Sequence, residues 1–156
     1  MKKRIIFFLP FFVHGGASES IFKLSKFLIK KNFSILVISI GKNSYKHQLK
    51  KLGCDLHEIK SSRALFSIFK LRDIIRHEIN KKYSQTLLIS NIHYANIIAL
   101  ISCFKLKGIK IILTERSSLS ELKIFKNTTF FLKNKIIYNL ARYLYKYSDL
   151  IVTNSI

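Results

Sequence analysis

Short apolar runs alternate along this chain with longer segments whose apolar residues recur every three or four positions, and no other feature constrains the fold as strongly. The runs Arg4–Leu9 and Ser34–Ile40 are apolar at most positions, as in strands that are buried on both faces. Between them, Ser18–Lys31 places Ile21 and Leu28 on one face of a helix and lysines elsewhere. Strands of this kind joined by helices predict a parallel sheet covered on both sides.

The alternation continues to the end of the sequence and predicts one α/β domain. Strands are predicted at Arg4–Leu9, Ser34–Ile40, Asp55–Ile59, Thr86–Ser90, Lys110–Thr114 and Leu150–Val152. Helices are predicted at Ser18–Lys31, His47–Leu52, Ala64–Lys82, Ala95–Lys107 and Lys133–Tyr147. The least regular segment, Ser117–Phe131, is predicted to be a long loop with a short helix around Leu119–Lys126. This pattern favours a Rossmann-like, doubly wound, mostly parallel sheet of about six strands with helices on both faces.

Length and cysteine content exclude several classes of protein. At 156 residues the chain suits a single domain, residues 1–156, and is too short for two ordinary domains. The longest apolar runs, Ile5–Val13 and Ile97–Phe104, are too short for a helix that spans a bilayer. Cys54 and Cys103 stand alone, so neither a disulfide framework nor a structural zinc site is expected, and a reduced cytosolic protein is the simpler interpretation.

The charge is strongly unbalanced, with 28 Lys and Arg against 8 Asp and Glu and a formal net charge of +20. Such a charge favours an anionic partner: nucleic acid, anionic lipid or a phosphorylated ligand. An A/T-rich genome, which raises Lys, Ile, Asn and Phe together, explains the composition about equally well. The Lys and Arg residues are spread along the chain and no nucleic-acid reader motif is present, so no nucleic-acid partner is expected.

The amino terminus allows two interpretations. Lys2, Lys3 and Arg4, followed by the apolar run Ile5–Val13, have the order of charges and apolar residues found in a signal peptide. Pro10 interrupts that run, however, and the later strands of the sheet need a first partner. We therefore expect a buried first strand, and a secreted or membrane-associated non-catalytic domain stays as the alternative.

Polar residues follow the predicted strands where a ligand would meet the sheet. Gly15 and Gly16 follow the first strand, His93 follows the fourth, and Glu115 and Arg116 follow the fifth. If the strand order is 3-2-1-4-5-6, these strands are neighbours and their carboxyl ends open on one crevice.

Each of these residue types has a chemical use and a plainer explanation. Paired glycines before a helix let a phosphate approach the backbone, but they are more often simply a turn. A histidine can donate to a sugar hydroxyl, although a lone histidine after a strand usually serves the loop. An arginine can hold a phosphate or carboxylate, yet Glu115 and Arg116 could equally pair with each other or face water.

Four motifs follow one another along nearly the whole chain. They occupy residues 15–28, 89–96, 113–117 and 148–155. In that order they resemble the "GGAE…LA..L" opening, the segment with a donor-site histidine, the "SERN"-like segment and the "AD.VV..S" segment of family-four glycosyltransferases. This resemblance, to the type that assembles bacterial oligosaccharides and lipid-linked glycans, implies one Rossmann-like half of a GT-B fold.

The resemblance also implies roles for individual residues. Gly15 and Gly16 match the loop that approaches the donor diphosphate. His93 matches a catalytic histidine that contacts the donor sugar, and Glu115 and Arg116 match residues on the acceptor side of the cleft. The donor is expected to be a UDP- or GDP-linked sugar, with no metal and no other cofactor. The chain departs from the motif at Ser18, where the family usually has Glu, although Glu19 follows.

The resemblance implies that most nucleotide-sugar contacts, including two glutamates eight residues apart, lie in a carboxyl-terminal donor-binding domain, and no two glutamates here are eight apart, so that domain is expected to be absent from this sequence. The whole enzyme is expected to transfer a sugar, with retention, from a nucleotide donor to a saccharide or polyprenyl-pyrophosphate-linked acceptor in cell-surface polysaccharide synthesis. We expect this half to be inactive alone. It is also expected to be cytoplasmic and to contact the anionic inner face of the plasma membrane. A basic nucleic-acid-binding or membrane-associated non-catalytic α/β domain is the alternative.

Overall fold

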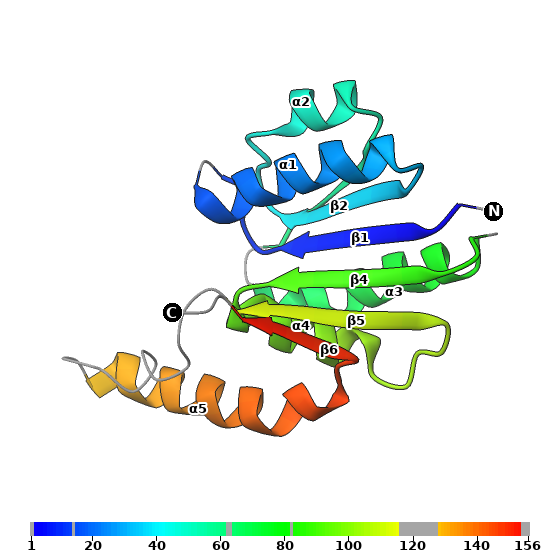
Figure 1. The fold of residues 1–156 in the computed structure, drawn as a ribbon. Helices are drawn as coiled ribbons and strands as arrows, with labels where there is room; N and C mark the ends of the chain where they lie inside the picture. Colours follow the sequence, from blue (N-terminus) through cyan, green and yellow to red (C-terminus); the bar gives the residue numbers. More distant parts are fainter. Residues whose placement is uncertain (1, 14, 62–63, 82, 116–127, 154–156) are drawn as a thin grey trace.

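A computed structural model describes residues 2–13, 15–61, 64–81, 83–115 and 128–153 of the chain. The strands are β1 (Arg4–Leu9), β2 (Ser34–Ile40), β3 (Asp55–Ile59), β4 (Thr86–Asn91), β5 (Ile109–Glu115) and β6 (Leu150–Thr153). The helices are α1 (Gly16–Lys30), α2 (Lys46–Lys51), α3 (Ser67–Ile79), α4 (His93–Cys103) and α5 (Thr128–Leu144), with single 3-10 turns η1 (Ala64–Phe66) and η3 (Tyr145–Tyr147). The strands form one parallel sheet in the order β3-β2-β1-β4-β5-β6 (Figure 1). The predicted fold class is confirmed, and the strand order is the one that the sequence analysis assumed.

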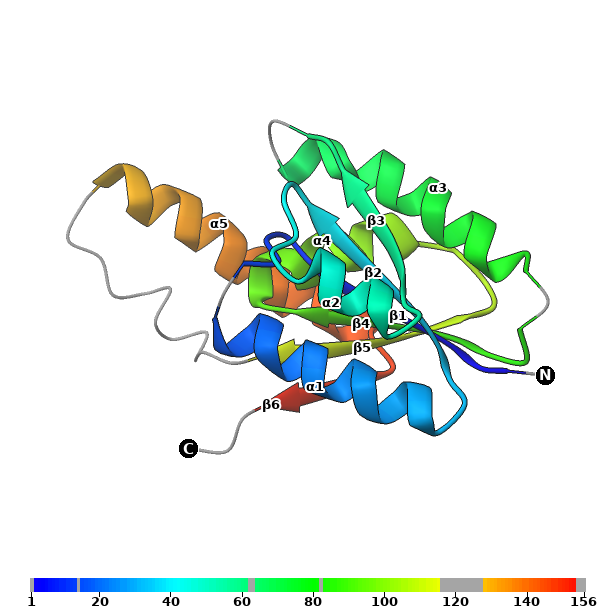
Figure 2. The same ribbon diagram turned by 90° about the horizontal axis from the view of Figure 1, so that it is seen from above.

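The central strand shows how the sequence builds two separate cores. Side chains alternate across β1, so Ile6 and Phe8 face one side of the sheet while Ile5, Phe7 and Leu9 face the other. The first side packs against α3, α4 and α5, and the second packs against α1 and α2 (Figure 2). All five side chains are almost fully buried, which explains why the strand is apolar throughout.

Helix α4 differs at both ends from its predicted bounds of Ala95–Lys107. It begins two residues earlier, because the Ile92 backbone turns sharply and its N–H donates to the Thr114 carbonyl of the neighbouring strand, 3.1 Å away. It also ends four residues earlier, where Lys105 adopts a left-handed φ of 59° that no helix continues. His93 is therefore the first residue of the helix and not part of a loop.

The segment before β6 also differs from its prediction. Helix α5 begins at Thr128, five residues before the predicted Lys133, so the predicted loop Ser117–Phe131 is wrong for its last residues. The short helix predicted around Leu119–Lys126 lies outside the described residues.

The first charged residue of β1 is buried in the sheet. Arg4 Nε donates to Glu78 of α3 at 2.7 Å, and Arg4 Nη1 lies 2.7 Å from both Ser34 Oγ and Asp55 Oδ2. The guanidinium thus joins β1, β2, β3 and α3 through paired charges, as a buried ion requires. The segment that the signal-peptide interpretation would remove is the central strand of this fold.

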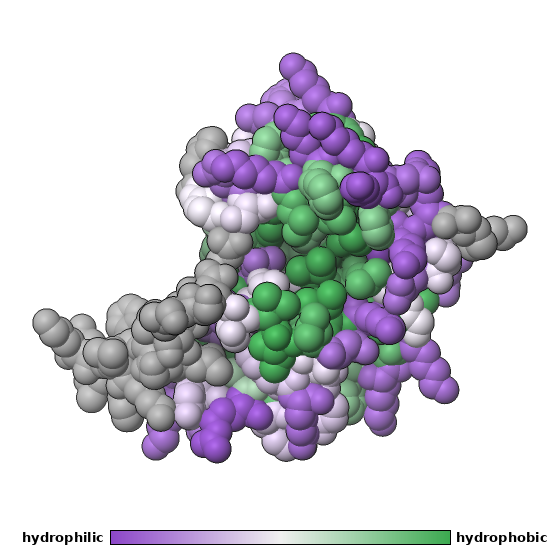
Figure 3. All heavy atoms as spheres, in the orientation of Figure 1, coloured by the Kyte–Doolittle hydropathy of each residue, from purple (hydrophilic) through white to green (hydrophobic). Residues whose placement is uncertain are grey.

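The edge strand β6 is partly uncovered in the described part of the chain. Leu150, Ile151 and Val152 of β6 are 53%, 43% and 45% exposed. Apolar atoms gather over this strand and beside α1 (Figure 3). None of the helices in the described ranges is long and apolar enough to cross a bilayer.

Candidate functional site

The carboxyl ends of β1, β4 and β5 gather the predicted site residues at one edge of the sheet. β1 and β4 are paired neighbours, and helices α1 and α4 leave them toward opposite faces (Figures 1 and 2). Gly15 and Gly16 open α1, His93 opens α4, and Glu115 ends β5. This is the point where the strand order reverses, and ligands of open α/β sheets bind there.

The turn into α4 holds His93 in place through an unusual backbone. Ile92 has φ 78° and ψ 133°, a conformation that a β-branched residue adopts only under constraint. Its N–H bonds to β5, and its carbonyl accepts the first helical hydrogen bond, from Asn96 N at 3.0 Å. The sheet and the helix thus fix the turn from both sides, so His93 starts from a rigid position.

His93 faces the carboxylate of Glu115. The distance from His93 Nδ1 to Glu115 Oε2 is 3.7 Å, and the two side chains are 18% and 6% exposed. Within the described part of the chain, neither of these two buried atoms has a hydrogen-bond partner. A small side-chain rotation would make the bond, which would keep the proton of a neutral imidazole on Nδ1 and leave Nε2 available for another group.

Two further side chains hold Glu115, and the sequence analysis missed both. Asn96 Nδ2 donates to Glu115 Oε1 at 2.9 Å, and the Tyr145 hydroxyl donates to the same oxygen. Burial and the hydrogen bond to Glu115 raise the pKa of Tyr145 far above its usual value, so its hydroxyl stays a donor. Asn96 lies three residues after His93 and so shares its helix face, which is a readable signal, whereas nothing in the sequence pairs Tyr145 with Glu115.

Several buried polar side chains gather at the carboxyl ends of β4 and β5. Thr114 Oγ1 donates to the Ser90 carbonyl at 3.1 Å and lies 2.6 Å from Asn91 Oδ1. Ser90 Oγ and Asn96 Oδ1 are buried without a partner among the described residues. Buried polar atoms are normally paired, so this concentration distinguishes the edge from the rest of the core.

The glycine pair lies beside open space. Apart from the chain neighbours and the backbone of α1 itself, no heavy atom of the described residues comes within 4 Å of the position that a Cβ would take at Gly15 or Gly16. The side chain of Ser18 is buried, while Glu19 is exposed and pairs with Lys23 at 2.8 Å. A ligand could therefore approach the backbone at the start of α1.

The structure leaves part of the predicted set undescribed. Arg116 lies outside the described residues, so its position stays a prediction. The crevice shared by Gly15, Gly16 and His93 also stays a prediction, although the helices that these residues open follow the neighbouring strands β1 and β4. No group of three or more His, Cys, Asp and Glu side chains in the described ranges is placed to hold a metal ion.

Comparison with protein families gives one match that covers most of the chain. The profile of a family described as glycosyl transferase 4-like matches residues 11–155 of this chain. No protein with a curated description matches it.

Several solved structures share the fold. HepE (Alr3699) of Anabaena, crystallised with UDP and glucose, superposes with a TM-score of 0.66 at 17% identity over 97% of this chain and 38% of its own. A glycosyltransferase of Rickettsia africae ESF-5 gives 0.61 at 19% identity over 97% of this chain and 42% of its own. MurG of Acinetobacter baumannii gives 0.55 at 11% identity over 98% of this chain and 41% of its own. The chain thus spans about two-fifths of the length of these proteins.

Proposed function

Because this chain belongs to the glycosyl transferase 4-like family, we propose that it is the amino-terminal, acceptor-side half of a retaining glycosyltransferase. The whole enzyme moves a hexose from a nucleotide-sugar donor to a saccharide or lipid-linked acceptor in cell-surface polysaccharide synthesis. The observation that carries this proposal is that the glycine loop, His93 and Glu115 follow or end neighbouring strands at the switch point of the sheet, where His93 faces Glu115. A carboxyl-terminal domain supplies the nucleotide contacts.

The donor is a nucleotide sugar, and its diphosphate lies at the Gly15–Gly16 loop. Two facts support this choice. The space in front of both glycines is open, and the first N–H groups of a helix attract anions. HepE of Anabaena, which has the same fold, was crystallised with UDP-glucose. The diphosphate needs no metal ion in this proposal, because the positive amino terminus of a helix stabilises its negative charge.

His93 acts on the sugar of the donor. Its Nδ1 faces Glu115, so Nε2 is the ring atom left to donate a hydrogen bond or to stabilise charge that develops as the donor bond breaks. A pre-positioned donor of this kind contributes more than a mobile one because it needs no reorganisation during the reaction. The fixed turn at Ile92 supports this role.

Glu115 and Arg116 belong to the acceptor side of the cleft. The Glu115 side chain is buried and bonded to Asn96 and Tyr145, so it serves this side through its neighbours and not by direct contact. Arg116, the next residue, is proposed to meet the pyrophosphate of a polyprenyl-linked acceptor, since a guanidinium holds phosphate oxygens in a forked contact.

The acceptor proposal places the protein at the cytoplasmic face of an anionic membrane. The formal net charge of +20 supports this location because anionic headgroups attract Lys and Arg over about a Debye length. The family match favours a transferase over the alternative of a basic nucleic-acid-binding domain.

A titration of the chain with UDP-glucose, followed by backbone NMR, tests the site. We expect the amide signals of Gly15, Gly16 and His93 to shift, because these groups line the donor position. Gly108, at the other end of the sheet, is the internal control, and uridine alone is the ligand control. Shifts confined to other parts of the chain would contradict the proposed donor site.

The chain alone is expected to transfer no sugar. Positioning of two reactants accounts for roughly 7–11 kcal/mol of a barrier, and half of a cleft loses most of it. The measurement is a transfer assay with the purified chain, a panel of UDP- and GDP-sugars and lipid-linked acceptors. Robust turnover without a second domain would show that the catalytic machinery has been misplaced.

A further inference from the structure

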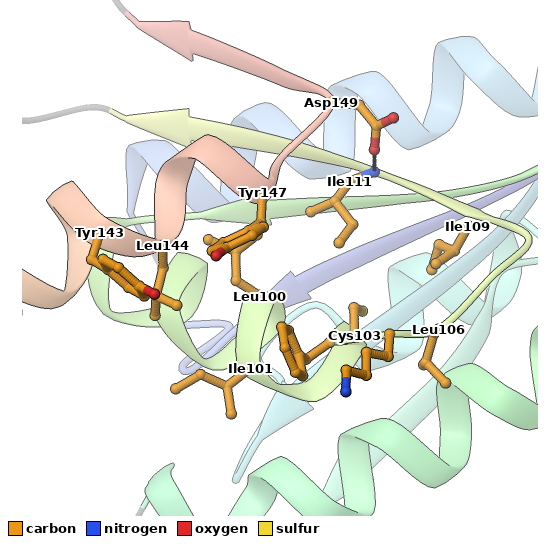
Figure 4. A pocket seen from close by; sticks show the side chains of 12 residues that line it. Leu100, Ile101, Cys103, Leu106, Ile109, Ile111, Tyr143, Leu144, Tyr147 and Asp149 are labelled. Atoms are coloured by element: carbon orange, nitrogen blue, oxygen red, sulfur yellow. Dashed lines mark hydrogen bonds between the residues drawn. The ribbon is translucent and has the colours of Figure 1, made fainter.

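A hollow lies at the amino ends of β5 and β6, away from the proposed reaction. Its volume is about 630 Å³, which is within the range of ordinary ligand sites. The end of α4, the first residues of β5 and the end of α5 with η3 form its walls (Figure 4). We call it the amino-edge pocket, and its inner wall includes Leu100, Cys103, Ile109, Ile111 and Leu144.

The inner wall of the amino-edge pocket offers almost nothing to a polar ligand. The backbone N–H of Ile111 is already bonded to Asp149 Oδ2 at 2.7 Å (Figure 4). Burial raises the pKa of the Cys103 thiol to about 12, so it stays neutral and is no nucleophile. An occupant that matches this wall is a hydrocarbon, because any polar group would lose its hydration without a partner.

The rim of the pocket is aromatic and cationic. Phe104 and Tyr147, 51% and 48% exposed, meet edge to face with ring centroids 6.3 Å apart. Lys105 Nζ lies 5.5 Å from the Phe104 ring, and Lys146 Nζ lies 4.4 Å from the Tyr143 ring. An apolar interior below a rim of ammonium groups is complementary to a hydrocarbon chain that ends in an anion.

The rim is held in shape without a ligand. Arg72 of α3 donates from Nη1 to the carbonyls of Ser102 and Phe104 at 2.9 and 2.8 Å, and so caps the end of α4. Lys105 keeps its left-handed backbone because the next amide, Leu106 N, donates to Cys103 O at 2.8 Å. A preformed site loses little conformational entropy when it binds.

An apolar stripe extends from the pocket along α5 and indicates a surface rather than a single soluble molecule as the partner. Ile136, Leu140, Tyr143 and Tyr147 are spaced four, three and four residues apart and are 38–60% exposed. Helices that lie in a membrane interface combine such a stripe with aromatic residues and lysines. Lys135, Arg142 and Lys146 are exposed along the same segment.

We propose that the amino-edge pocket and the α5 stripe are the surface by which this protein docks on an anionic bilayer. The hydrocarbon chain of an anionic lipid enters the pocket, and its headgroup lies against Lys105 and Lys146. This inference deepens the membrane contact of the proposed function and rests on it. The competing hypothesis is that the bilayer contacts α1, which carries exposed lysines on the other face of the sheet.

A single tryptophan tests the docking surface, because the sequence contains no tryptophan. Phe104→Trp places the probe at the pocket rim. Phe27→Trp is the matched control, since Phe27 on α1 is 56% exposed and has Lys31 Nζ 5.8 Å from its ring. With vesicles of phosphatidylcholine and phosphatidylglycerol carrying brominated acyl chains, we expect quenching and a blue shift at position 104 and little change at position 27.

The lysines are tested by a second pair of variants with equal net charge. Lys105→Gln combined with Lys146→Gln should weaken partitioning into the same vesicles about thirtyfold, from about fivefold for each lysine at the surface. Lys26→Gln combined with Lys30→Gln, on α1, should weaken it several times less. Circular dichroism melting checks that each variant is folded.

The outcomes separate this inference from the proposed reaction. Equal quenching at positions 104 and 27, equal losses for both lysine pairs, equal binding to pure phosphatidylcholine, or no vesicle binding would each overturn the docking surface. None of these measurements requires sugar transfer. A chain that docks as described but shifts none of the site amides with UDP-glucose would instead sink the proposed function.

Discussion

The two ends of β5 are built from opposite chemistry. At its carboxyl end, Glu115 is buried with Asn96 and Tyr145 and faces His93 across 3.7 Å. At its amino end, Ile109 and Ile111 line an apolar pocket, and the Ile111 amide there donates to Asp149. One end thus concentrates unpaired polar atoms, and the other offers apolar surface.

The difference follows from the direction of the helices in a parallel α/β fold. Helices α1 and α4 begin at the carboxyl edge, so their free N–H groups and positive dipole ends point there and suit anionic ligands. Helix α4 ends at the amino edge, where Arg72 caps its carbonyls and lysines complement its negative end. The fold itself therefore separates a polar chemical edge from a basic apolar edge.

The largest expected effect is on catalysis at the carboxyl edge. In a complete enzyme, His93→Ala should lower turnover about 10²–10³-fold, because a pre-positioned donor to the transition state is lost. Acceptor binding should change less, since the contact strengthens only during the reaction. Steady-state kinetics measure this, with the exposed His47→Ala on α2 as the control. Equal losses in turnover and acceptor affinity would assign His93 to binding.

A pair of carboxylates compares the two edges in stability. Glu115→Ala leaves the buried Tyr145 hydroxyl without its acceptor and removes one acceptor of Asn96 Nδ2, which keeps the Thr114 carbonyl at 3.2 Å, and should cost about 2–4 kcal/mol of unfolding free energy. Asp149→Ala, at the amino edge, removes one acceptor from a partly exposed site and should cost about 1 kcal/mol. Urea denaturation of both variants measures the two losses of unfolding free energy. Losses of the same size would contradict the proposed difference between the two edges.

Two glycines compare structural need with availability for a ligand. Gly108, at the amino edge, has φ 85°, and a Cβ there would meet Ile79 Cγ2 at 3.0 Å. Gly108→Ala should therefore lower the unfolding free energy by about 1–2 kcal/mol. Gly16→Ala, at the carboxyl edge, meets open space within a helix and should change stability by less than about 1 kcal/mol.

The same Gly16→Ala variant tests the donor proposal. If a phosphate approaches this backbone, the added methyl group should weaken the binding of UDP-glucose, so that the site amides shift only at higher ligand concentrations. The midpoint of thermal unfolding should stay the same. An unchanged titration would mean that the glycine pair serves only the turn.

The smallest effect concerns alkaline pH. Because the pKa of Tyr145 is raised in the folded chain, its contribution to stability is complete below the ordinary value of about 10 and is lost as pH rises above it. The unfolded chain then releases a proton that the folded chain keeps, a loss of up to about 1.4 kcal/mol per pH unit. Urea denaturation between neutral pH and about pH 11 should show a steeper decline for the natural chain than for Tyr145→Phe. Parallel declines would show that Tyr145 ionises freely.

The sequence by itself determined the layers and the edge where the chemistry lies. The bounds of β1, β2 and β3 follow from their apolar and β-branched runs, and the parallel direction of the strands follows from the helices between them, whereas the strand order was only supposed. His93, Gly15 and Glu115 reach the carboxyl edge for the same local reason, because each follows or ends a strand. Hydrophobic period and chain direction are properties of neighbouring residues, so a single sequence expresses them.

Only the tertiary structure decided which atoms meet. Glu115 bonds to Asn96 from 19 residues away, and Asn96 reaches Tyr145 across 49 residues. The amino-edge pocket likewise depends on α4 ending at Cys103. Arg72, from helix α3, caps this end by donating a hydrogen bond to the Phe104 carbonyl. Such contacts form only when helices pack across a sheet. The interactions that stabilise them join segments far apart in the sequence, so no pattern of neighbouring residues predicts them.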